Sequence, residues 1–400
     1  MYSVTYLVKV EPNANNNKFY RMIPQGDSFK VEYGRIGVGG FQSLVYPLSK
    51  WESTYRSKLK KGYEDQTRLI EDLVVKSPER KYTDISDPSV LDIVNRLQDM
   101  AKKTIAANYT VAATNVTNAM IDEAQGLLNE LLQLSDITEF NSKLVDLFKV
   151  LPRRMKNVSD YLAQSTNDFD KIIAKEQDLL DVMKGQVVHA NIFESNDMDV
   201  DIETQTILDA FGLVIESIND TDKTKIKYNL GNLSYKFHKA WQIKNIKTQK
   251  IFDDFVKQNG NLHTKLLWHG SRNENWWNIV NTGLILRPTN VVITGKMFGM
   301  GTYFATKAQK SFGYTSYSGS YWARGNAGNA FMGLYDVAYG KPYDVHSFEN
   351  KLQTMTYEKL QKECAGANCL HAHADSMLRN DEIVVYKEDQ TTIRYLVELK

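Results

Sequence analysis

The hydrophobic pattern of this 400-residue chain changes its period twice, and these changes limit the folds that the chain can adopt. Over residues 2–46, apolar residues alternate with polar ones in short runs, which is typical of strands. Over residues 86–185, apolar residues recur at helical spacing, and from about residue 225 short strands return. We therefore predict an α+β protein with a small β-rich module, an α-helical bundle and a mixed β-sheet domain.

The helical region contains four apolar stripes, and one basic helix precedes it at about residues 49–60. Pro152 follows the third stripe and should end its helix. Several amphipathic helices in series predict a bundle in which the stripes form the core. The stripes are Val90, Val94, Leu97 and Ala101; Ala124, Leu127, Leu128 and Leu131; Leu144, Leu147, Phe148 and Leu151; and Phe169, Ile172, Ile173, Leu180 and Met183.

A chain of this length has room for two to four domains of about 100–200 residues each. The changes of pattern place the joints near residue 80 and between residues 190 and 225. The predicted domains are residues 1–80, 85–195 and 205–400.

The net charge is only +1, which argues against a uniformly basic coat for nucleic acid. Charge is uneven, however, because residues 1–61 carry ten Lys or Arg and four Asp or Glu. Such a segment suits an anionic partner, and a solvated surface without a partner is the alternative interpretation.

Cysteine content and the N-terminus bear on the compartment. Cys364 and Cys369 are too few for a disulfide scaffold and fit a reducing environment. The first residues lack the pattern of a signal peptide, and no run of 18 apolar residues occurs. We expect an intracellular protein without a membrane partner, nuclear in a eukaryote and at the nucleoid in a bacterium or phage.

Three short segments each place a polar residue at the end of an apolar strand. Alone, each has an ordinary structural explanation: a core histidine, a packing tyrosine and a glutamate at a solvated strand end. The segments are residues 266–272 (LLWHGSR), residues 297–305 (MFGMGTYFA) with 310–314 (KSFGY), and residues 380–386 (NDEIVVY).

Together and in this order, the segments resemble the His–Tyr–Glu signature of the poly(ADP-ribose) polymerase catalytic domain, with His269, Tyr303 and Glu382 at the matching positions. Whole phrases are similar: LLWHGS, TGKMFGMGTYFA, NDEIVVY and IRYLVELK. The resemblance implies an NAD ADP-ribosyltransferase that uses NAD as a substrate, transfers ADP-ribose to protein acceptors including itself, and requires no metal. A dinucleotide-binding GxGxxG loop is absent, because Gly299 and Gly301 lack the third glycine.

The resemblance also implies roles for single residues. Glu382 would stabilise the positive charge that develops on the ribose as nicotinamide leaves. His269 and Ser271 would bind the adenosine-side ribose, and the backbone of Gly270 with the Ser311 hydroxyl would bind the nicotinamide amide. The rings of Tyr303 and Tyr314 would stack on nicotinamide.

The N-terminal module resembles a WGR domain, in which Tyr33 replaces the tryptophan of Tyr33-Gly34-Arg35. Tyr33 would stack on a terminal sugar or base of a DNA end. Phosphate contacts would come from basic residues. These are Arg35, Lys58, Lys60 and Lys61. A module that mediates only domain contacts is the alternative. The bundle resembles the family's regulatory domain, which covers the NAD cleft until DNA loosens it, and a plain scaffold is its alternative.

Within the family, the glutamate at the position of Glu382 accompanies polymer formation, so we predict a polymerase stimulated by DNA ends. The acceptor segment, residues 343–379, matches the family less closely. A mono-ADP-ribosyltransferase for a protein or a nucleic-acid end, and a non-catalytic DNA-end module, remain the alternatives.

One further pattern suits zinc chemistry, since cysteine and histidine are its usual ligands. The spacing of Cys364, Cys369, His371 and His373 is wider than common zinc pairs, and the two histidines would share a face only in an extended strand. We predict a surface loop here and no metal site.

Overall fold

The computed structural model covers the whole chain. It describes residues 2–36, 40–67, 82–110, 116–195, 205–286, 297–317, 327–375 and 378–400, with side chains of helix α5 described as far as residue 187. Contacts divide the chain into two compact units. The first comprises Met1–Glu79 and Lys102–Glu194, and the second comprises Arg80–Ala101 and Ser195–Lys400. The three domain boundaries predicted from the sequence stay a prediction.

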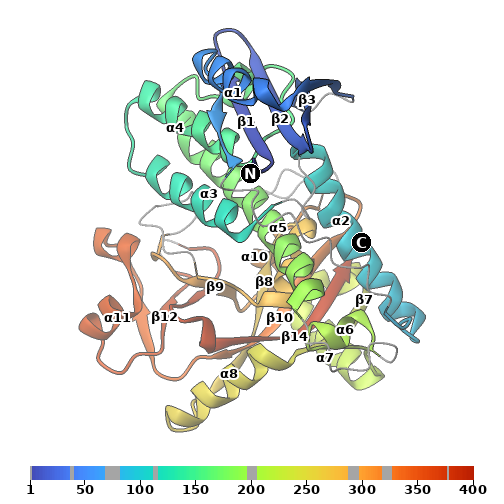
Figure 1. Cartoon of the computed structure of the whole chain (residues 1–400). Helices are drawn as coiled ribbons and strands as arrows, with labels where there is room; N and C mark the ends of the chain where they lie inside the picture. Colours follow the sequence, from blue (N-terminus) through green and yellow to red (C-terminus); the bar gives the residue numbers. More distant parts are fainter. Residues whose placement is uncertain are drawn as a thin grey trace. The chain divides into compact units, whose positions relative to one another are not determined.

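The first unit begins with an antiparallel five-stranded sheet in the order β4-β3-β2-β1-β5, of which Figure 1 labels β1, β2 and β3. Its buried face carries Leu7, Met22, Phe29 and Val31, against which Trp51 packs. Burial of alternate residues explains why the predicted period of two gives this sheet. The elements are β1 (Thr5–Glu11), β2 (Asn16–Gln25), β3 (Ser28–Arg35), β4 (Gln42–Pro47), α1 (Trp51–Lys60) and β5 (Glu64–Asp65).

The four predicted stripes lie on four helices. Thr117 and Asp136 accept hydrogen bonds from free N–H groups at the starts of α3 and α4, and α4 ends at Val150, two residues before Pro152. The rings of Phe140 and Phe169 stack with centroids 3.8 Å apart. The helices are α2 (Pro88–Asn108), which begins in the second unit, α3 (Asn118–Leu131), α4 (Ile137–Val150) and α5 (Phe169–Ser195).

The second unit is built on a nine-stranded mixed sheet in the order β11-β12-β13-β9-β8-β10-β14-β7-β6. β11 and β12 are parallel, and the other pairings are antiparallel. The strands are β6 (Leu213–Ser217), β7 (Phe237–Asn245), β8 (Thr264–Gly270), β9 (Thr302–Ala305), β10 (Ala330–Ala338), β11 (Pro342–Val345), β12 (Cys369–Ala372), β13 (Glu382–Val385) and β14 (Thr391–Leu399).

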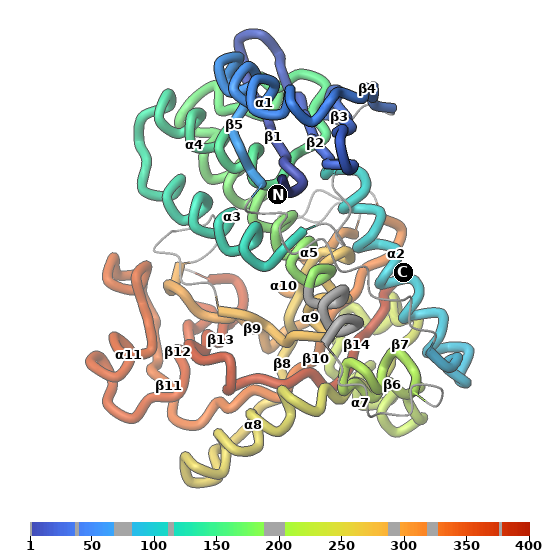
Figure 2. The backbone as a smooth tube through the Cα atoms, in the orientation of Figure 1, coloured from blue at the N-terminus to red at the C-terminus, as the bar shows by residue number. Residues whose placement is uncertain are grey.

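Helices pack against this sheet, and α8, at the bottom of Figure 2, contacts β14 and β7. The first half of α2 is tied to the same unit, because Trp241 donates its indole N–H to Ser89, and Arg96 forms an ion pair with the fully buried Glu398. The remaining helices are α6 (Ile207–Ala210), α7 (Asp220–Leu230), α8 (Ile246–Gln258), α9 (Trp276–Thr282), α10 (Ala308–Phe312) and α11 (Tyr357–Glu363).

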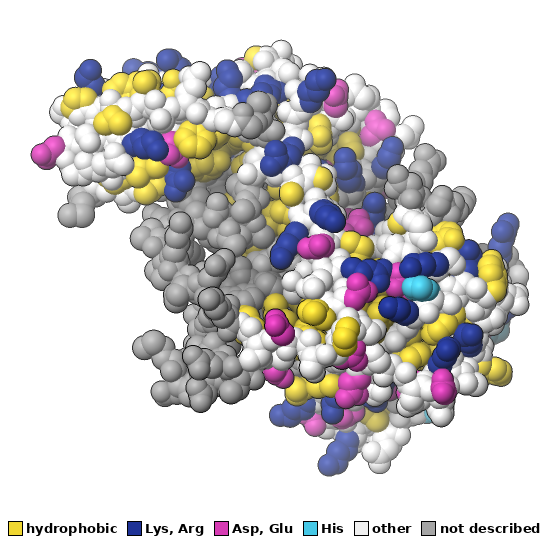
Figure 3. Space-filling model, turned by 90° about the vertical axis from the view of Figure 1, so that its right-hand side faces the viewer, with side chains coloured by type: hydrophobic (Ala, Val, Ile, Leu, Met, Phe, Trp, Pro, Cys, Tyr) yellow, Lys and Arg dark blue, Asp and Glu magenta, His cyan; other side chains and the backbone are white. Residues whose placement is uncertain are grey.

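Two surface properties accord with the composition. Among the described residues, none of the helices combines the length and apolar character that a membrane span requires. On the face drawn in Figure 3, basic and acidic side chains are interspersed, which fits the net charge of +1.

Candidate active site

The three predicted catalytic residues lie on three adjacent strands. Ala305 of β9 pairs with Trp268 of β8 on one side and with Glu382 of β13 on the other. This register brings the end of β8, with His269, close to the start of β13, with Glu382. More than 100 residues separate these segments along the chain, and the order of strands in the sheet joins them.

His269 is held as a neutral ring. Its Nδ1 lies 3.0 Å from the carbonyl oxygen of Tyr303, and burial lowers its pKa below the usual value. Since a carbonyl can only accept, Nδ1 carries the proton and Nε2 is left as an acceptor. The rings of Phe304 and Tyr335 pack around the imidazole. The site therefore offers a fixed acceptor nitrogen that suits a hydroxyl group.

Tyr303 is fixed at its hydroxyl. Phe298 donates its N–H to that oxygen at 3.0 Å, and the hydroxyl donates to the carbonyl of Gly299 at 2.9 Å. Burial raises the pKa of Tyr303 and raises that of Tyr314 to about 12, and the Glu382 carboxylate adds to both shifts. Both phenols therefore stay neutral, and both lie within electrostatic reach of Glu382.

Gly270 lies against the backbone of α10. A Cβ atom added at Gly270 would stand 1.9 Å from the carbonyl oxygen of Ser311, so only glycine fits. The Ser311 hydroxyl donates to the carbonyl of Trp268 at 3.0 Å, and Ser271 accepts a bond from Asn275 at 3.1 Å. The residues predicted to bind NAD thus lie on β8, β9 and α10 or, for Ser271 and Tyr314, within two residues of the ends of β8 and α10.

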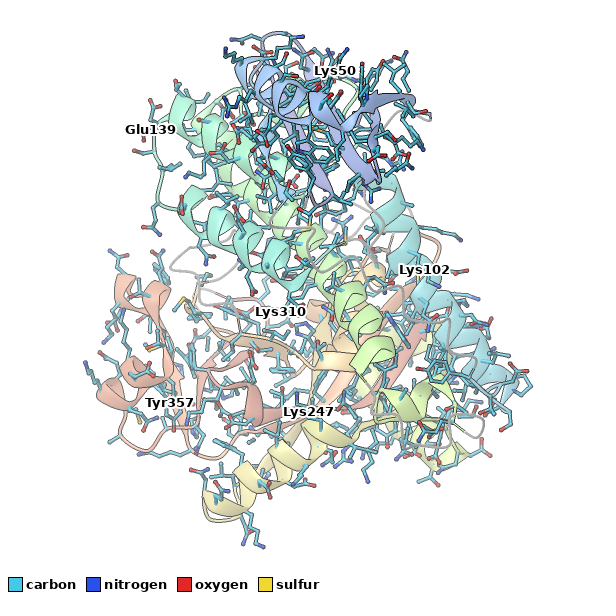
Figure 4. All side chains as sticks on the ribbon, viewed as in Figure 1. Lys50, Lys102, Glu139, Lys247, Lys310 and Tyr357 are labelled. Atoms are coloured by element: carbon cyan, nitrogen blue, oxygen red, sulfur yellow. The ribbon has the colours of Figure 1, made fainter. Side chains whose placement is uncertain are left out.

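Glu382 is buried, with 5% of its surface exposed, and not at a solvated strand end. Its Oε1 lies 2.7 Å from Nζ of Lys310, which is labelled in Figure 4. Burial raises the pKa of Glu382, and the Lys310 charge opposes that shift. Lys310 had no predicted role. Its position directly before Ser311, a predicted NAD-binding residue, could have indicated that it lies in the site.

Comparison with known proteins agrees with this arrangement. The poly(ADP-ribose) polymerase catalytic domain matches residues 224–400, and the WGR domain matches residues 3–69. The chain belongs to the poly(ADP-ribose) polymerase family. In the segment 294–305, for which the sequence predicted a likeness to the family, residues 294–296 lie outside the described residues.

Similar proteins come from viruses, plants and animals. Poly [ADP-ribose] polymerase 2 of Arabidopsis thaliana is 21% identical over 96% of this chain and 71% of its own length. Two proteins of Invertebrate iridescent virus 6 match about half of this chain. The uncharacterized protein 101L is 30% identical over 80% of its length, and the putative poly [ADP-ribose] polymerase-like 100L is 28% identical over 99% of its length.

Membership of this family and the matched catalytic domain make the chain an NAD+ ADP-ribosyltransferase, with NAD as its substrate. The transferase activity predicted from the sequence is therefore confirmed. The prediction of an α+β fold with a WGR-type module, a helical region and a mixed catalytic sheet is confirmed as well.

The basic residues predicted to bind DNA at the WGR module differ in their surroundings: some make internal contacts and others are exposed. Arg35 donates to the carbonyls of Asn15 and Lys156, at 2.6 Å and 2.7 Å. The Lys58 ammonium stands over the Tyr20 ring, 3.8 Å from its centroid, and 5.7 Å from the centroid of Tyr33. The other two predicted lysines, Lys60 and Lys61, have exposed side chains.

Proposed function

We propose that this chain is a poly(ADP-ribose) polymerase that elongates ADP-ribose on protein acceptors, including itself, and that DNA ends stimulate it. The observation that carries the polymerase part is Glu382, a buried carboxylate whose Oε1 is held 2.7 Å from the Lys310 ammonium. The other carboxylate oxygen is left to act on the substrate.

The proposed reaction breaks the bond between the nicotinamide nitrogen and C1′ of the ribose. The bonding electrons leave with nicotinamide, and positive charge spreads over the ribose ring. A preformed carboxylate in a partly dry site stabilises this charge without reorganising. The acceptor hydroxyl then bonds to C1′ through its oxygen, and its proton passes to the Glu382 carboxylate or to water. During elongation the acceptor is a ribose hydroxyl, which Glu382 would orient as it attacks.

NAD would be positioned by the groups around these strands. The neutral Nε2 of His269 would accept from a hydroxyl of the adenosine-side ribose, with Ser271 nearby. The nicotinamide amide would pair with the Gly270 backbone and the Ser311 hydroxyl. Its ring would stack between Tyr303 and Tyr314, both of which are neutral.

For the DNA part, we propose that the WGR module meets the end of a duplex. The exposed lysines Lys60 and Lys61 suit phosphate contacts, and Tyr33 offers an aromatic face. Arg35 and Lys58 would have to exchange the internal contacts described above for phosphate. The exposed pair is therefore the better test of this proposal.

The test is to incubate the full chain with labelled NAD, with and without blunt duplex DNA, and to run the products on a denaturing gel. A smear that appears only with DNA supports both parts of the proposal. A single sharp band would instead identify a mono-ADP-ribosyltransferase. A smear of equal intensity without DNA would remove the stimulation by DNA ends and keep the polymerase.

A further inference from the structure

A cluster of histidine and aspartate side chains lies at the β11 edge of the catalytic sheet. In the parallel pairing of β11 with β12, Asp344 stands directly opposite His371. The ladder continues past the strand ends, because the N–H of His373 donates to the carbonyl of Val345 at 2.9 Å. His371 and His373 are two residues apart in extended chain, so they lie on one face of the sheet, with Asp344.

Their polar atoms converge. Nε2 of His373 lies 2.7 Å from Oδ1 of Asp344, and Nδ1 of His371 lies 3.8 Å from the same oxygen. One ligand atom from each of the three side chains lies within 4.8 Å of the others. The rings of His371 and His373 are stacked with centroids 3.9 Å apart, so the two imidazoles are already held side by side.

His371 is the buried member of the cluster, with 8% of its surface exposed. Its Nε2 is buried without a hydrogen bond to any residue that the structure describes, and Oδ2 of Asp381 lies 3.4 Å away. A histidine that binds a metal through one nitrogen usually donates the other N–H to a carboxylate, as Asp381 would allow here. The hydroxyl of Tyr339 forms a hydrogen bond with Nδ1 at 2.8 Å, and an ion bound at Nδ1 would replace this bond.

The cysteines that accompany these histidines in the sequence do not belong to the cluster. Cys369 is fully buried, its Sγ donates to the carbonyl of Tyr339, and burial raises its pKa to about 12. Cys364 follows the end of α11. The prediction of a surface loop is wrong for residues 369–372, which form β12. The sequence analysis expected His371 and His373 to share a face only in an extended strand, and β12 provides that strand.

We propose that Asp344, His371 and His373 bind a divalent transition-metal ion, with Zn²⁺ as the ion that the donors suit best. Two imidazoles and one carboxylate are common zinc ligands, whereas Mg²⁺ and Ca²⁺ prefer oxygen alone. Ligands about 2.1 Å from a tetrahedral zinc ion stand roughly 3.4 Å apart. The separations of 2.7 Å and 3.8 Å lie on either side of that value, so shifts of less than about 1 Å would bring these two pairs to it.

The ion would act on the sheet and not on the transferred group. Glu382 pairs with Ala372 across β13 and β12, and neighbouring residues of a strand point to opposite faces. His371 and His373 therefore lie on the face opposite Glu382. Among the strands that the structure describes, β11 is the edge strand and pairs with β12 alone, so an ion bridging Asp344 to the histidines would pin that edge. Asp344 is half exposed, which leaves a path for entry.

The test uses the full chain, stripped with a chelator and dialysed, titrated with ZnCl₂ in a calorimeter and with MgCl₂ as the control ion. The expected result is one equivalent of Zn²⁺ bound, no Mg²⁺ bound, and a rise in melting temperature with Zn²⁺. Co²⁺ as a spectroscopic probe should give visible bands typical of a tetrahedral site with nitrogen ligands.

Matched variants locate the ion. Asp344→Asn and His373→Ala change partly exposed side chains, and each should weaken Zn²⁺ binding at least about tenfold and abolish the melting shift. His238→Ala removes an exposed histidine elsewhere in the catalytic unit and should change neither. The proposal is overturned if the parent chain takes up no Zn²⁺, in which case the cluster is a hydrogen-bonded network, or if both variants bind Zn²⁺ as tightly as the parent.

Discussion

Nζ of Lys310 lies 2.7 Å from Oε1 of Glu382, and this pair joins helix α10 to the first residue of β13. A buried carboxylate is driven toward its neutral form by desolvation, and a neighbouring cation drives it back toward the charged form. Lys310 thus keeps Glu382 available as the anion that an oxocarbenium-like transition state requires. Because Lys310 affects the charge of Glu382, the pH dependence of the activity tests the role of this ion pair.

Replacing the carboxylate itself should separate binding from chemistry. Glu382→Gln keeps the size of the side chain and removes its charge, so we expect NAD affinity to stay within about threefold and kcat to fall about 10²–10³-fold. Elongation should be lost, with any residual product as a short band. Glu216→Gln, on the exposed part of β6, is the control. Persistence of long polymer in Glu382→Gln would contradict the role given to this residue.

Replacing Lys310 should shift the acid limb of the pH–activity profile. Burial already raises the pKa of Glu382 above its usual 4.5, and Lys310 lowers it. Since the active carboxylate is the charged form, activity rises as the pH rises through this pKa. Lys310→Met removes the opposing charge and should move the acid limb of the kcat profile to higher pH.

The control for that shift is Lys307→Met, which removes an exposed cation at the residue preceding α10. It should leave the limb in place. An unchanged profile in Lys310→Met would mean that another group sets the acid limb. The raised pKa of Glu382 also affects folding. Because the native state holds this proton more tightly than the unfolded chain does, Glu382 stabilises the fold below pH 4.5, and this contribution is lost as the pH rises through the raised pKa.

Gly270→Ala should damage the nicotinamide side of the site. The new Cβ would meet the Ser311 carbonyl oxygen at 1.9 Å, so β8 and α10 must separate. We expect a loss of about 1–3 kcal/mol in unfolding free energy and at least a tenfold rise in KM for NAD. Gly126→Ala is the matched control, because nothing lies within 4 Å of a Cβ added in the middle of α3. It should stabilise the protein by up to about 1 kcal/mol.

The double variant Lys60→Gln, Lys61→Gln tests the DNA proposal without disturbing internal contacts of the WGR module. If both lysines contact phosphates, DNA affinity should fall and the slope of log affinity against log salt should decrease by about 2. Fluorescence anisotropy with a blunt duplex measures both quantities. Lys239→Gln, an exposed lysine of β7, serves as the control. An unchanged slope would place the DNA contacts elsewhere.

A buried ion pair in the first unit predicts a stability effect. Nη2 of Arg153 lies 3.5 Å from Oε1 of Glu176, and both side chains are at least 95% buried. Glu176→Gln leaves the guanidinium without its counter-charge, so urea unfolding should show a loss of about 3–5 kcal/mol. The double variant Arg153→Met, Glu176→Leu removes both charges and should recover most of that loss. If Glu176→Gln were as stable as the parent, the ion pair would contribute little to the free energy of unfolding.

Local patterns determined much of this protein before any coordinates. The four stripes predicted the four helices because burial of one helix face requires apolar residues at a period of 3.6. The order of His269, Tyr303 and Glu382 in strand-end phrases predicted the transferase. Such features depend on neighbours along the chain, and a single sequence records them directly.

Only the tertiary structure decided which distant groups meet. Lys310 meets Glu382 because α10 packs against β8 and β9, and β9 pairs with β13. Arg35 meets the Lys156 carbonyl because the WGR sheet packs against α4 of its own unit. Asp344 joins His371 because β11 and β12 pair in parallel at one register. Pairing register and helix packing depend on the summed burial of many side chains, so no local stretch of sequence specifies them.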